Sequence, residues 1–200
     1  MARATEPWAA LAAALTRSAP ASSDFDLSPE AAPPNRRLRP AGVLMAVEDR
    51  PDGARIYLTK RSPALKHHPG QIAFPGGKQD AGDPDPVAAA LREAEEEIGL
   101  SRAGVEVLGT LPPHETVTGF SVTPVLARVA APFEPVPEPG EVAEIFAVPF
   151  GHLADPGNYT VQARRWRGQM RHYYTVPWGP YYIWGATARI LRGLAERLAS

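Results

Sequence analysis

The sequence predicts an α/β fold in which helices cover both faces of a central β-sheet, as a sandwich. Two observations support this class. Several short segments are rich in aliphatic residues or alternate between apolar and polar ones, and glycine or proline separates them, as expected for strands. Two other segments repeat apolar residues at helical spacing. Strands and helices that follow one another in this way form layers around a shared core.

Residues 1–40 form an extension that is rich in alanine and proline and precedes the main domain. Trp8, Leu11 and Leu15 could line one face of a short helix, which we expect to dock on the domain as a cap. A signal peptide is the competing interpretation of this run. The run is short and dominated by alanine, and Glu6 precedes it, so the docking helix is favoured.

The main domain spans residues 41–200, and short apolar segments should build its sheet. We predict these strands at residues 41–48, 55–60, 71–74, 104–111, 121–130 and 144–149. A hairpin is predicted over residues 159–176, with its turn near Arg167 and Gly168. Residues 131–141 are punctuated by proline and should form an irregular loop.

The two predicted helices of the domain each carry an apolar stripe that should face a core. The first begins in the acidic and proline-rich residues 83–86 and ends at Gly99. Its stripe consists of Val87, Leu91, Ala94 and Ile98. The second helix spans residues 184–198. Its stripe consists of Ile190, Leu191, Leu194 and Leu198.

The first helix also carries a group of carboxylates. Glu93, Glu96 and Glu97 stand at positions i, i+3 and i+4, so they share one face, away from the apolar stripe. A solvated acidic face is the usual meaning of such a run. However, only Arg92 is adjacent to relieve the repulsion, and the glycine pair Gly76–Gly77 has no obvious purpose unless a ligand approaches its backbone. Unpaired carboxylates of this kind suit Mg²⁺ or Mn²⁺.

The segment from the glycine pair to the end of this helix resembles the Nudix box, G-x5-E-x7-R-E-U-x-E-E-x-G-U, where U is aliphatic. Gly77 fits the opening glycine. The closing half is matched by Arg92, Glu93, Ala94, Glu96, Glu97, Gly99 and Leu100. There are two departures, because Asp83 stands where the family usually has glutamate and eight residues rather than seven separate it from Arg92. We still expect Asp83 to pair with Arg92. The resemblance implies the Nudix fold, an α/β/α sandwich around a mixed sheet.

Residues 58–77, LTKRSPALKHHPGQIAFPGG, resemble the additional signature of the Nudix coenzyme A diphosphatases. The matching residues are Arg61, Ser62, His68, Gly70, Phe74, Pro75, Gly76 and Gly77. Leu65 is shifted from the usual spacing. The resemblance implies hydrolysis of the diphosphate of coenzyme A or its derivatives to 4′-phosphopantetheine and adenosine 3′,5′-bisphosphate, with Mg²⁺ or Mn²⁺ as the cofactor.

This resemblance also implies roles for residues of the helix. Glu93 and Glu97 would be metal ligands, since carboxylates at i and i+4 can reach one ion. Glu96 would be a third ligand or would position the attacking water. Arg92 would brace the glutamates and the turn. The general base varies within the family and often lies outside the box.

The best candidate for that base is Glu141, on the loop in GEVAEIF. Members of the subfamily tend to carry a Glu-Val pair at this place. Glu144 and Glu115 are weaker candidates. For all three residues the alternative is an exposed loop carboxylate without a catalytic role.

The substrate would be held mainly by the signature that precedes the helix. Arg61 would bind a phosphate of coenzyme A, because its guanidinium group suits phosphate oxygens. His68 would contact a phosphate or shape the turn, and the backbone of Gly76 and Gly77 would let a phosphate approach. An aromatic group near the C-terminus could stack on adenine, although a role in the core is favoured. Its members are Trp178, Tyr181, Tyr182 and Trp184.

Composition restricts the alternatives. The net charge is −1 with no basic run, which argues against nucleic-acid and anionic-membrane partners, and the absence of cysteine excludes a thiolate site. No segment approaches the roughly 18 apolar residues that span a bilayer, so a cytoplasmic enzyme with a small-molecule substrate is expected. A homodimer is left open. The competing functions are a Nudix hydrolase of ADP-ribose, a dinucleotide or an oxidised nucleotide, and a non-catalytic module that binds a nucleotide.

Overall fold

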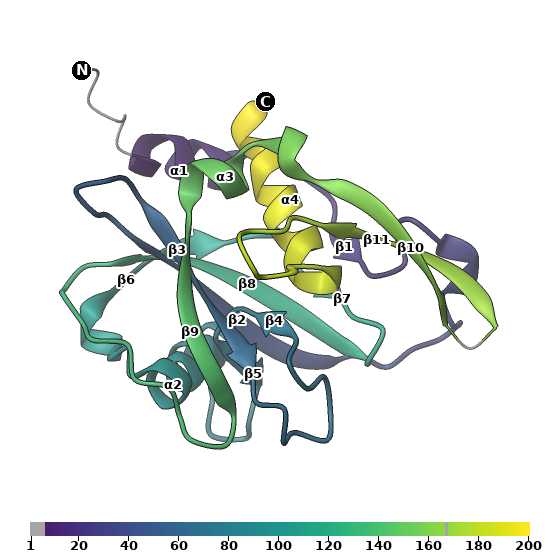
Figure 1. The fold of residues 1–200 in the computed structure, drawn as a ribbon, viewed down its shortest axis with the longest axis horizontal. Helices are drawn as coiled ribbons and strands as arrows, with labels where there is room; N and C mark the ends of the chain where they lie inside the picture. The colour runs from purple at the N-terminus through teal and green to yellow at the C-terminus, as the bar shows by residue number, and fades with distance from the viewer. Residues whose placement is uncertain (1–6, 167) are drawn as a thin grey trace.

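A mixed β-sheet lies between two layers of helices in the computed structural model of the protein, which describes residues 7–166 and 168–200 (Figure 1). The strands of this part are β1 (Ser22–Ser23), β2 (Arg39–Glu48), β3 (Arg55–Arg61), β4 (Ile72–Ala73), β5 (Gly76–Lys78), β6 (Val105–Thr110), β7 (His114–Glu115), β8 (Phe120–Val129), β9 (Val142–Pro149), β10 (Thr160–Trp166) and β11 (Gln169–Thr175). Its α-helices are α1 (Pro7–Thr16), α2 (Pro86–Ile98), α3 (Phe150–Ala154) and α4 (Gly185–Ala199). The predicted sandwich is confirmed.

The strand β2 lies at the centre of the sheet, and its pairing determines where the glycine pair sits. It pairs with β8 in parallel along one edge, whereas β5 and β3 pair antiparallel with opposite ends of its other edge. At the end where β2 and β3 are not paired with each other, β4 pairs with β3 and β5 pairs with β2. Gly76 and Gly77 of β5 therefore lie within the sheet, at the end where β2 and β3 are not paired with each other.

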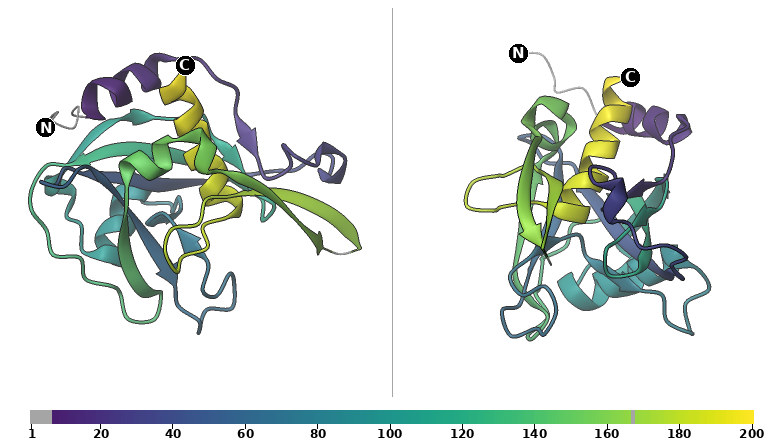
Figure 2. Two further views of the ribbon diagram at one scale, coloured as in Figure 1. Left: turned by 45° about the horizontal axis from the view of Figure 1, so that its top comes forward. Right: turned by 90° about the vertical axis from the view of Figure 1, so that its right-hand side faces the viewer.

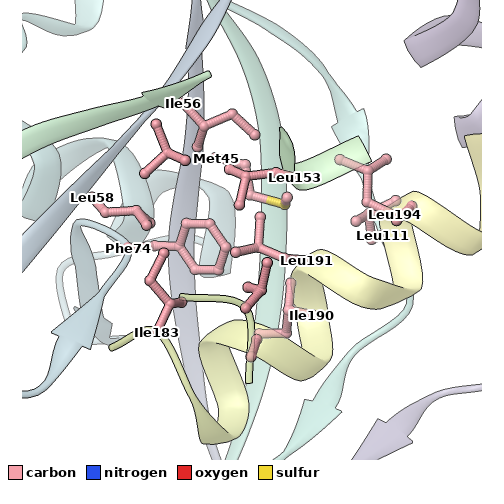
Figure 3. Packing of buried hydrophobic residues seen from close by; sticks show 14 of the residues in the cluster. Met45, Ile56, Leu58, Phe74, Leu111, Leu153, Ile183, Ile190, Leu191 and Leu194 are labelled. Atoms are coloured by element: carbon pink, nitrogen blue, oxygen red, sulfur yellow. The ribbon is translucent and has the colours of Figure 1, made fainter. Parts of the chain in front are cut away.

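Both faces of the sheet are covered, as the near-continuous apolar sequence of β2 requires. On one face α2 packs Ala94 and Ile98 into a core with Leu44. On the other face α4, α1 and α3 lie over the main core, which Figure 2 shows from two sides. Figure 3 shows Leu191 of α4 packing among side chains from β2, β3 and the segment before β5. Two helical layers thus hold the strands in register.

The ends of α2 agree with the signals in the sequence. The Asp85 side chain caps the helix by accepting the Ala88 N–H at 2.8 Å, and Pro86 is its first residue. Gly99 ends it in the left-handed conformation, with φ of 73°. The helix start lies directly on β2, because a Cβ added to Gly42 would be 1.8 Å from the Pro86 carbonyl oxygen. These contacts place α2 tightly against the sheet.

The segment before β2 packs onto the same core. Leu11 of α1 is fully buried in it, and Trp8 and Leu15 pack against it half-buried. The Arg197 guanidinium of α4 donates to the carbonyl oxygens of Ala14, at 2.7 Å, and of Arg17, at 2.6 Å. β1 then adds to the sheet beside β7. Residues 1–6, including Glu6, lie outside the described residues.

Several elements differ from the sequence predictions. The glycine pair belongs to β5 rather than to a turn, because it pairs with residues 41–43 of β2. The two-residue strands β1 and β7 and the short helix α3 were not expected from the sequence. The loop over residues 131–141 and the hairpin of β10 and β11 are confirmed. Gly168 lies in the hairpin turn with φ of 84°, and Arg167 lies outside the described residues.

Candidate active site

The glycine pair and the glutamates of α2 are in direct contact. A Cβ added to Gly77 would lie 2.6 Å from Oε1 of Glu93, so the Glu93 carboxylate rests on the bare backbone of Gly77. The N–H of Gly76 donates to Oε2 of Glu97 at 3.0 Å. Gly76 itself has φ of 147°, and a Cβ there would lie 2.4 Å from the Gly42 carbonyl oxygen. Close contacts within the protein therefore require both glycines, which corrects the expectation that the pair has no purpose unless a ligand approaches its backbone.

Arg92 bridges Asp83, which precedes α2, and the glutamates of that helix. Its guanidinium group lies 2.9 Å from Asp83, 3.0 Å from Glu93 and 2.9 Å from Glu96. The hydrogen bond from Arg92 lowers the pKa of Asp83, and the same contact is the main reason that the pKa of Arg92 is raised. The expected pairing of Asp83 with Arg92 is confirmed. The shorter aspartate and the extra residue before the arginine are thus compatible with this contact.

Glu97 is buried, with 5% of its surface exposed, which corrects the expectation that all three glutamates lie on an open face. The reason is that β5 packs across this side of α2, a long-range contact that helical periodicity does not contain. The pKa of Glu97 is raised to about 7, mainly by burial and also by the charges of Glu93 and Glu141, against the opposing effects of the Gly76 N–H and of Arg61. Burial also raises the pKa of Glu93.

The donor set fits a divalent cation of the Mg²⁺ or Mn²⁺ type. Glu93 and Glu97 offer hard oxygen ligands whose negative charge is only partly compensated, since burial and neighbouring carboxylates raise both of their pKa values. Within residues 7–166 and 168–200, no three acidic or histidine side chains converge on one point. Glu96 is more than half exposed and turns to Arg92 instead. Two carboxylates are nevertheless sufficient, because Mg²⁺ usually retains several waters.

Arg61, the last residue of β3, belongs to the segment that resembles the coenzyme A diphosphatase signature and lies near Glu97. The backbone N–H of Arg61 donates to the Gln71 carbonyl at 2.9 Å, and the backbone N–H of Ser62 donates to the Glu141 carbonyl at 2.8 Å. The Nε atom of Arg61 is buried without a hydrogen-bond partner among the described residues, and the Arg61 charge lowers the pKa of Glu97. Arg61 is therefore a cation near Glu97 with one buried donor, Nε, that has no partner among the described residues.

His68 is the substrate-binding candidate that the structure leaves apart from the cluster. It is exposed on the loop between β3 and β4, with φ of 55°, and its carbonyl accepts the Gln71 N–H at 3.2 Å. A positive φ is uncommon for a residue with a side chain. The residue shapes the loop, and none of its described contacts joins it to Glu93 or Glu97.

The three candidates for the general base differ in their surroundings. Glu141 is exposed, and its charge raises the pKa values of Glu93 and Glu97. The Glu144 carboxylate instead accepts a hydrogen bond from the Tyr181 hydroxyl. Glu115 forms an ion pair with Arg36 at 2.9 Å. Of the three, Glu141 alone is shown to act on the cluster through its charge.

The aromatic group near the C-terminus divides into two parts. Trp178 and Tyr181 pack against the main core, and Tyr181 stacks on Phe146 with 3.6 Å between ring centroids. Tyr182, in contrast, is 46% exposed. Sequence reasoning also missed Gly42, although a lone glycine within an aliphatic strand is a signal for close approach of another backbone.

Comparisons with known proteins find similar sequences and folds. A family model described as NUDIX domain matches residues 38–170. The chain is 39% identical over 162 residues to "Uncharacterized Nudix hydrolase NudL" of Klebsiella pneumoniae, covering 81% of this chain and 84% of that protein. It is 38% identical over 172 residues to the protein of the same description from Cronobacter sakazakii, covering 86% and 89%.

A solved structure shares the fold. This is the MutT/nudix family protein of Enterococcus faecalis, with a TM-score of 0.50 at 14% identity, covering 84% of this chain and 64% of that one. At this identity the likeness concerns the fold alone. Among the described residues, no helix is both long and apolar enough to cross a membrane.

Proposed function

Because the chain belongs to the Nudix hydrolase family, we propose that it hydrolyses the diphosphate of coenzyme A or its derivatives. The products would be 4′-phosphopantetheine and adenosine 3′,5′-bisphosphate. Nudix hydrolases act on small nucleoside diphosphate derivatives and need a divalent cation, and this much holds for the chain as a family member. Coenzyme A is the finer part of the proposal.

One observation carries the choice of substrate. The segment that resembles the coenzyme A diphosphatase signature ends in the glycine pair that contacts Glu93 and Glu97. The same segment contributes Arg61, whose Nε atom is buried without a partner in the described part of the chain. A phosphate oxygen is a suitable acceptor for this group, because guanidinium donors match phosphate geometry.

The roles proposed for the chain's own residues follow from these contacts. Glu93 and Glu97 would hold a divalent cation, which supplies charge neutralisation at the diphosphate and acidifies water. Arg92 holds the Glu93 carboxylate in place. The bare backbone at Gly77 leaves room for the Glu93 carboxylate to lie against it, and Arg61 would neutralise an oxygen of the substrate's phosphate. Binding and orientation of this kind account for much of catalysis in phosphoryl transfer.

In the reaction, a bond forms between water oxygen and one phosphorus while the bond from that phosphorus to the bridging oxygen breaks. Glu141 would accept the proton of the attacking water, because its carboxylate acts on the cluster and is exposed to solvent. Glu96 would orient that water from the edge of the cluster, with Arg92 fixing its carboxylate at 2.9 Å. The phosphate that leaves carries the bridging oxygen and its electron pair.

Product analysis tests the proposal. The protein would be incubated with coenzyme A, ADP-ribose and NADH, with Mg²⁺, with Mn²⁺ and with chelator, and the products identified by mass spectrometry. We expect metal-dependent release of 4′-phosphopantetheine and adenosine 3′,5′-bisphosphate, and we expect Glu97→Gln to remove most of it. Cleavage of only the other substrates would refute the coenzyme A assignment. No turnover at all would support a nucleotide-binding module, and full activity of Glu97→Gln would refute the metal assignment.

A further inference from the structure

A group of aromatic residues, one of them exposed and two partly buried, lies where the β10–β11 ribbon joins the body of the protein. We call Tyr173, Tyr182, Trp184 and Arg164 the aromatic platform. The rings of Tyr173 and Trp184 meet edge to face with 5.2 Å between centroids, and the hydroxyls of Tyr173 and Tyr182 are 3.4 Å apart. The guanidinium carbon of Arg164 lies 5.7 Å from the Trp184 ring centroid. The platform thus combines π faces with a positive charge.

Tyr182 distinguishes the platform from ordinary packing. Its neighbour Tyr181 is stacked on Phe146 and hydrogen-bonded to Glu144, as expected for a residue that fixes the loop. Tyr182 is 46% exposed although the two residues are adjacent in sequence. An exposed aromatic ring beside other rings and an arginine is a surface on which a flat, anionic ligand can bind.

The start of α4, which follows the platform in the chain, lies beside the segment that leads to the candidate active site. A Cβ added to Gly185, the residue after Trp184, would lie 3.9 Å from Nε2 of Gln71. The Gln71 carbonyl accepts the N–H of Arg61, whose charge acts on Glu97. Nearby, the Thr187 hydroxyl donates to the Ile72 carbonyl at 3.0 Å. Figure 1 accordingly places the segment between β11 and α4 beside β4.

We propose that the aromatic platform binds the purine ring of the substrate's nucleotide half and that Arg164 binds the phosphate on its ribose. This inference rests on the proposed function, because it assigns the part of the substrate that is remote from the scissile diphosphate. Tyr182, which is 46% exposed, would stack on the base. The guanidinium group of Arg164 lies over the Trp184 ring, and from this position it would bind a phosphate on the ribose.

The ribbon provides a matched control for Arg164. In the β10–β11 register Arg164 is opposite Arg171, whereas Arg165 is opposite Met170. Successive side chains of a strand point to opposite faces, so Arg165 faces away from the platform. Arg164→Gln and Arg165→Gln therefore remove the same charge from the same strand, and only the first removes it from the platform.

Calorimetric titration of the full chain with adenosine 3′,5′-bisphosphate and with adenosine 5′-monophosphate tests the inference. We expect Tyr182→Ala to weaken binding of both nucleotides by about tenfold, as for loss of one stacking side chain. Arg164→Gln should weaken binding of the bisphosphate and leave that of the monophosphate nearly unchanged. Arg165→Gln should change neither Kd. Thermal unfolding of each variant would show that the fold is retained.

The opposite results would overturn the inference. If Tyr182→Ala binds both nucleotides as the wild type does, or if the wild type does not bind the bisphosphate at all, the platform is not a purine site. If both arginine variants weaken the bisphosphate equally, Arg164 has no specific role. The titration does not depend on turnover. A failure to cleave coenzyme A would therefore refute the proposed function separately from the platform.

Discussion

Among single residues, Glu97 combines a charge with burial, and this combination has a measurable consequence for stability. Burial raises its pKa from the usual 4.5 to about 7 in the folded protein without metal. Between these pH values the folded state holds a proton that the unfolded state has lost, so stability must fall as pH rises through this window. The shift corresponds to roughly 3 kcal/mol. The cation is expected to offset this cost when it binds.

Unfolding by urea in the presence of chelator, at pH 5 and at pH 8, measures this effect. We expect the wild type to be less stable at pH 8, and we expect Glu97→Gln to lose most of that difference while keeping the Gly76 hydrogen bond through its amide oxygen. The same pH dependence in both proteins would show that Glu97 titrates normally.

The two glycines of the pair should respond differently to a side chain. In Gly77→Ala the new Cβ would meet the Glu93 carboxylate, which is the flexible end of a side chain, so the protein should fold while activity falls by about 100-fold. In Gly76→Ala it would meet the Gly42 backbone at a positive φ, so the free energy of unfolding should fall by about 1–3 kcal/mol. Gly82→Ala is the control, because a Cβ added there would have no atom within 4 Å.

Assays of diphosphate hydrolysis and of thermal unfolding on the three glycine variants separate these effects. A normally active Gly77→Ala would mean that the position of Glu93 is not critical. An unchanged Tm for Gly76→Ala would mean that β5 can shift away from β2 without loss of stability.

At the level of elements, the position of α2 on the sheet depends on how closely its first turn approaches β2. Gly42→Ala would place a Cβ 1.8 Å from the Pro86 carbonyl, which can be relieved only by moving the helix. We expect a loss of about 1–3 kcal/mol or more and a loss of activity, because the glutamates move with the helix. Gly193→Ala within α4 meets only the end of Arg189, at 3.6 Å, and should gain about 0.5–1 kcal/mol.

Denaturation curves of Gly42→Ala and Gly193→Ala test this contrast. The first variant adds a methyl group where α2 touches the sheet, and the second adds one where space is available. Equal stabilities of Gly42→Ala and the wild type would contradict the tight contact of α2 with β2. A destabilised Gly193→Ala would contradict the open surroundings of that residue.

The length of the strands explains why some of them were predicted from the sequence and others were not. Strands β2 and β8 carry ten residues each, enough for an apolar pattern to stand out. β1 and β7 have two residues each. β1 is defined by its pairing with the distant β7, and β7 is also paired with β8. A pattern cannot be read from two residues, so such strands follow only from tertiary contacts. The same reason explains the assignment of the glycine pair to β5.

In the molecule as a whole, Arg197 ties α1 to α4 on the side of the sheet opposite α2. Its guanidinium donates to two carbonyl groups at the end of α1 and is largely buried. Arg197→Met keeps the aliphatic contacts and removes both hydrogen bonds. We expect a loss on the order of 3 kcal/mol, with an unchanged KM at 20 °C because the glutamates lie on the other face.

Thermal unfolding together with steady-state kinetics at low temperature checks this expectation. A changed KM with unchanged stability would show that the contact between α1 and α4 influences the active site instead of supporting the fold.

The sequence by itself was enough for what is encoded locally. The spacing of apolar residues and the capping residues predicted α2 and its ends, and the box motif predicted the family and the contact of Asp83 with Arg92. These features involve residues within one helix or one turn of it, where distance along the chain determines distance in space.

The assembly of the site, in contrast, follows from tertiary contacts. These contacts buried Glu97 under β5, brought Arg61 and Glu141 to the same carboxylates, and separated Tyr182 from the core aromatics. The burial of Glu97 depends on packing of α2 against β5, and the approach of Arg61 and Glu141 follows from pairing of β3 with β9. Burial and electrostatic surroundings are properties of the packed molecule, so a one-dimensional pattern can name the charged residues but cannot state which of them lose their water.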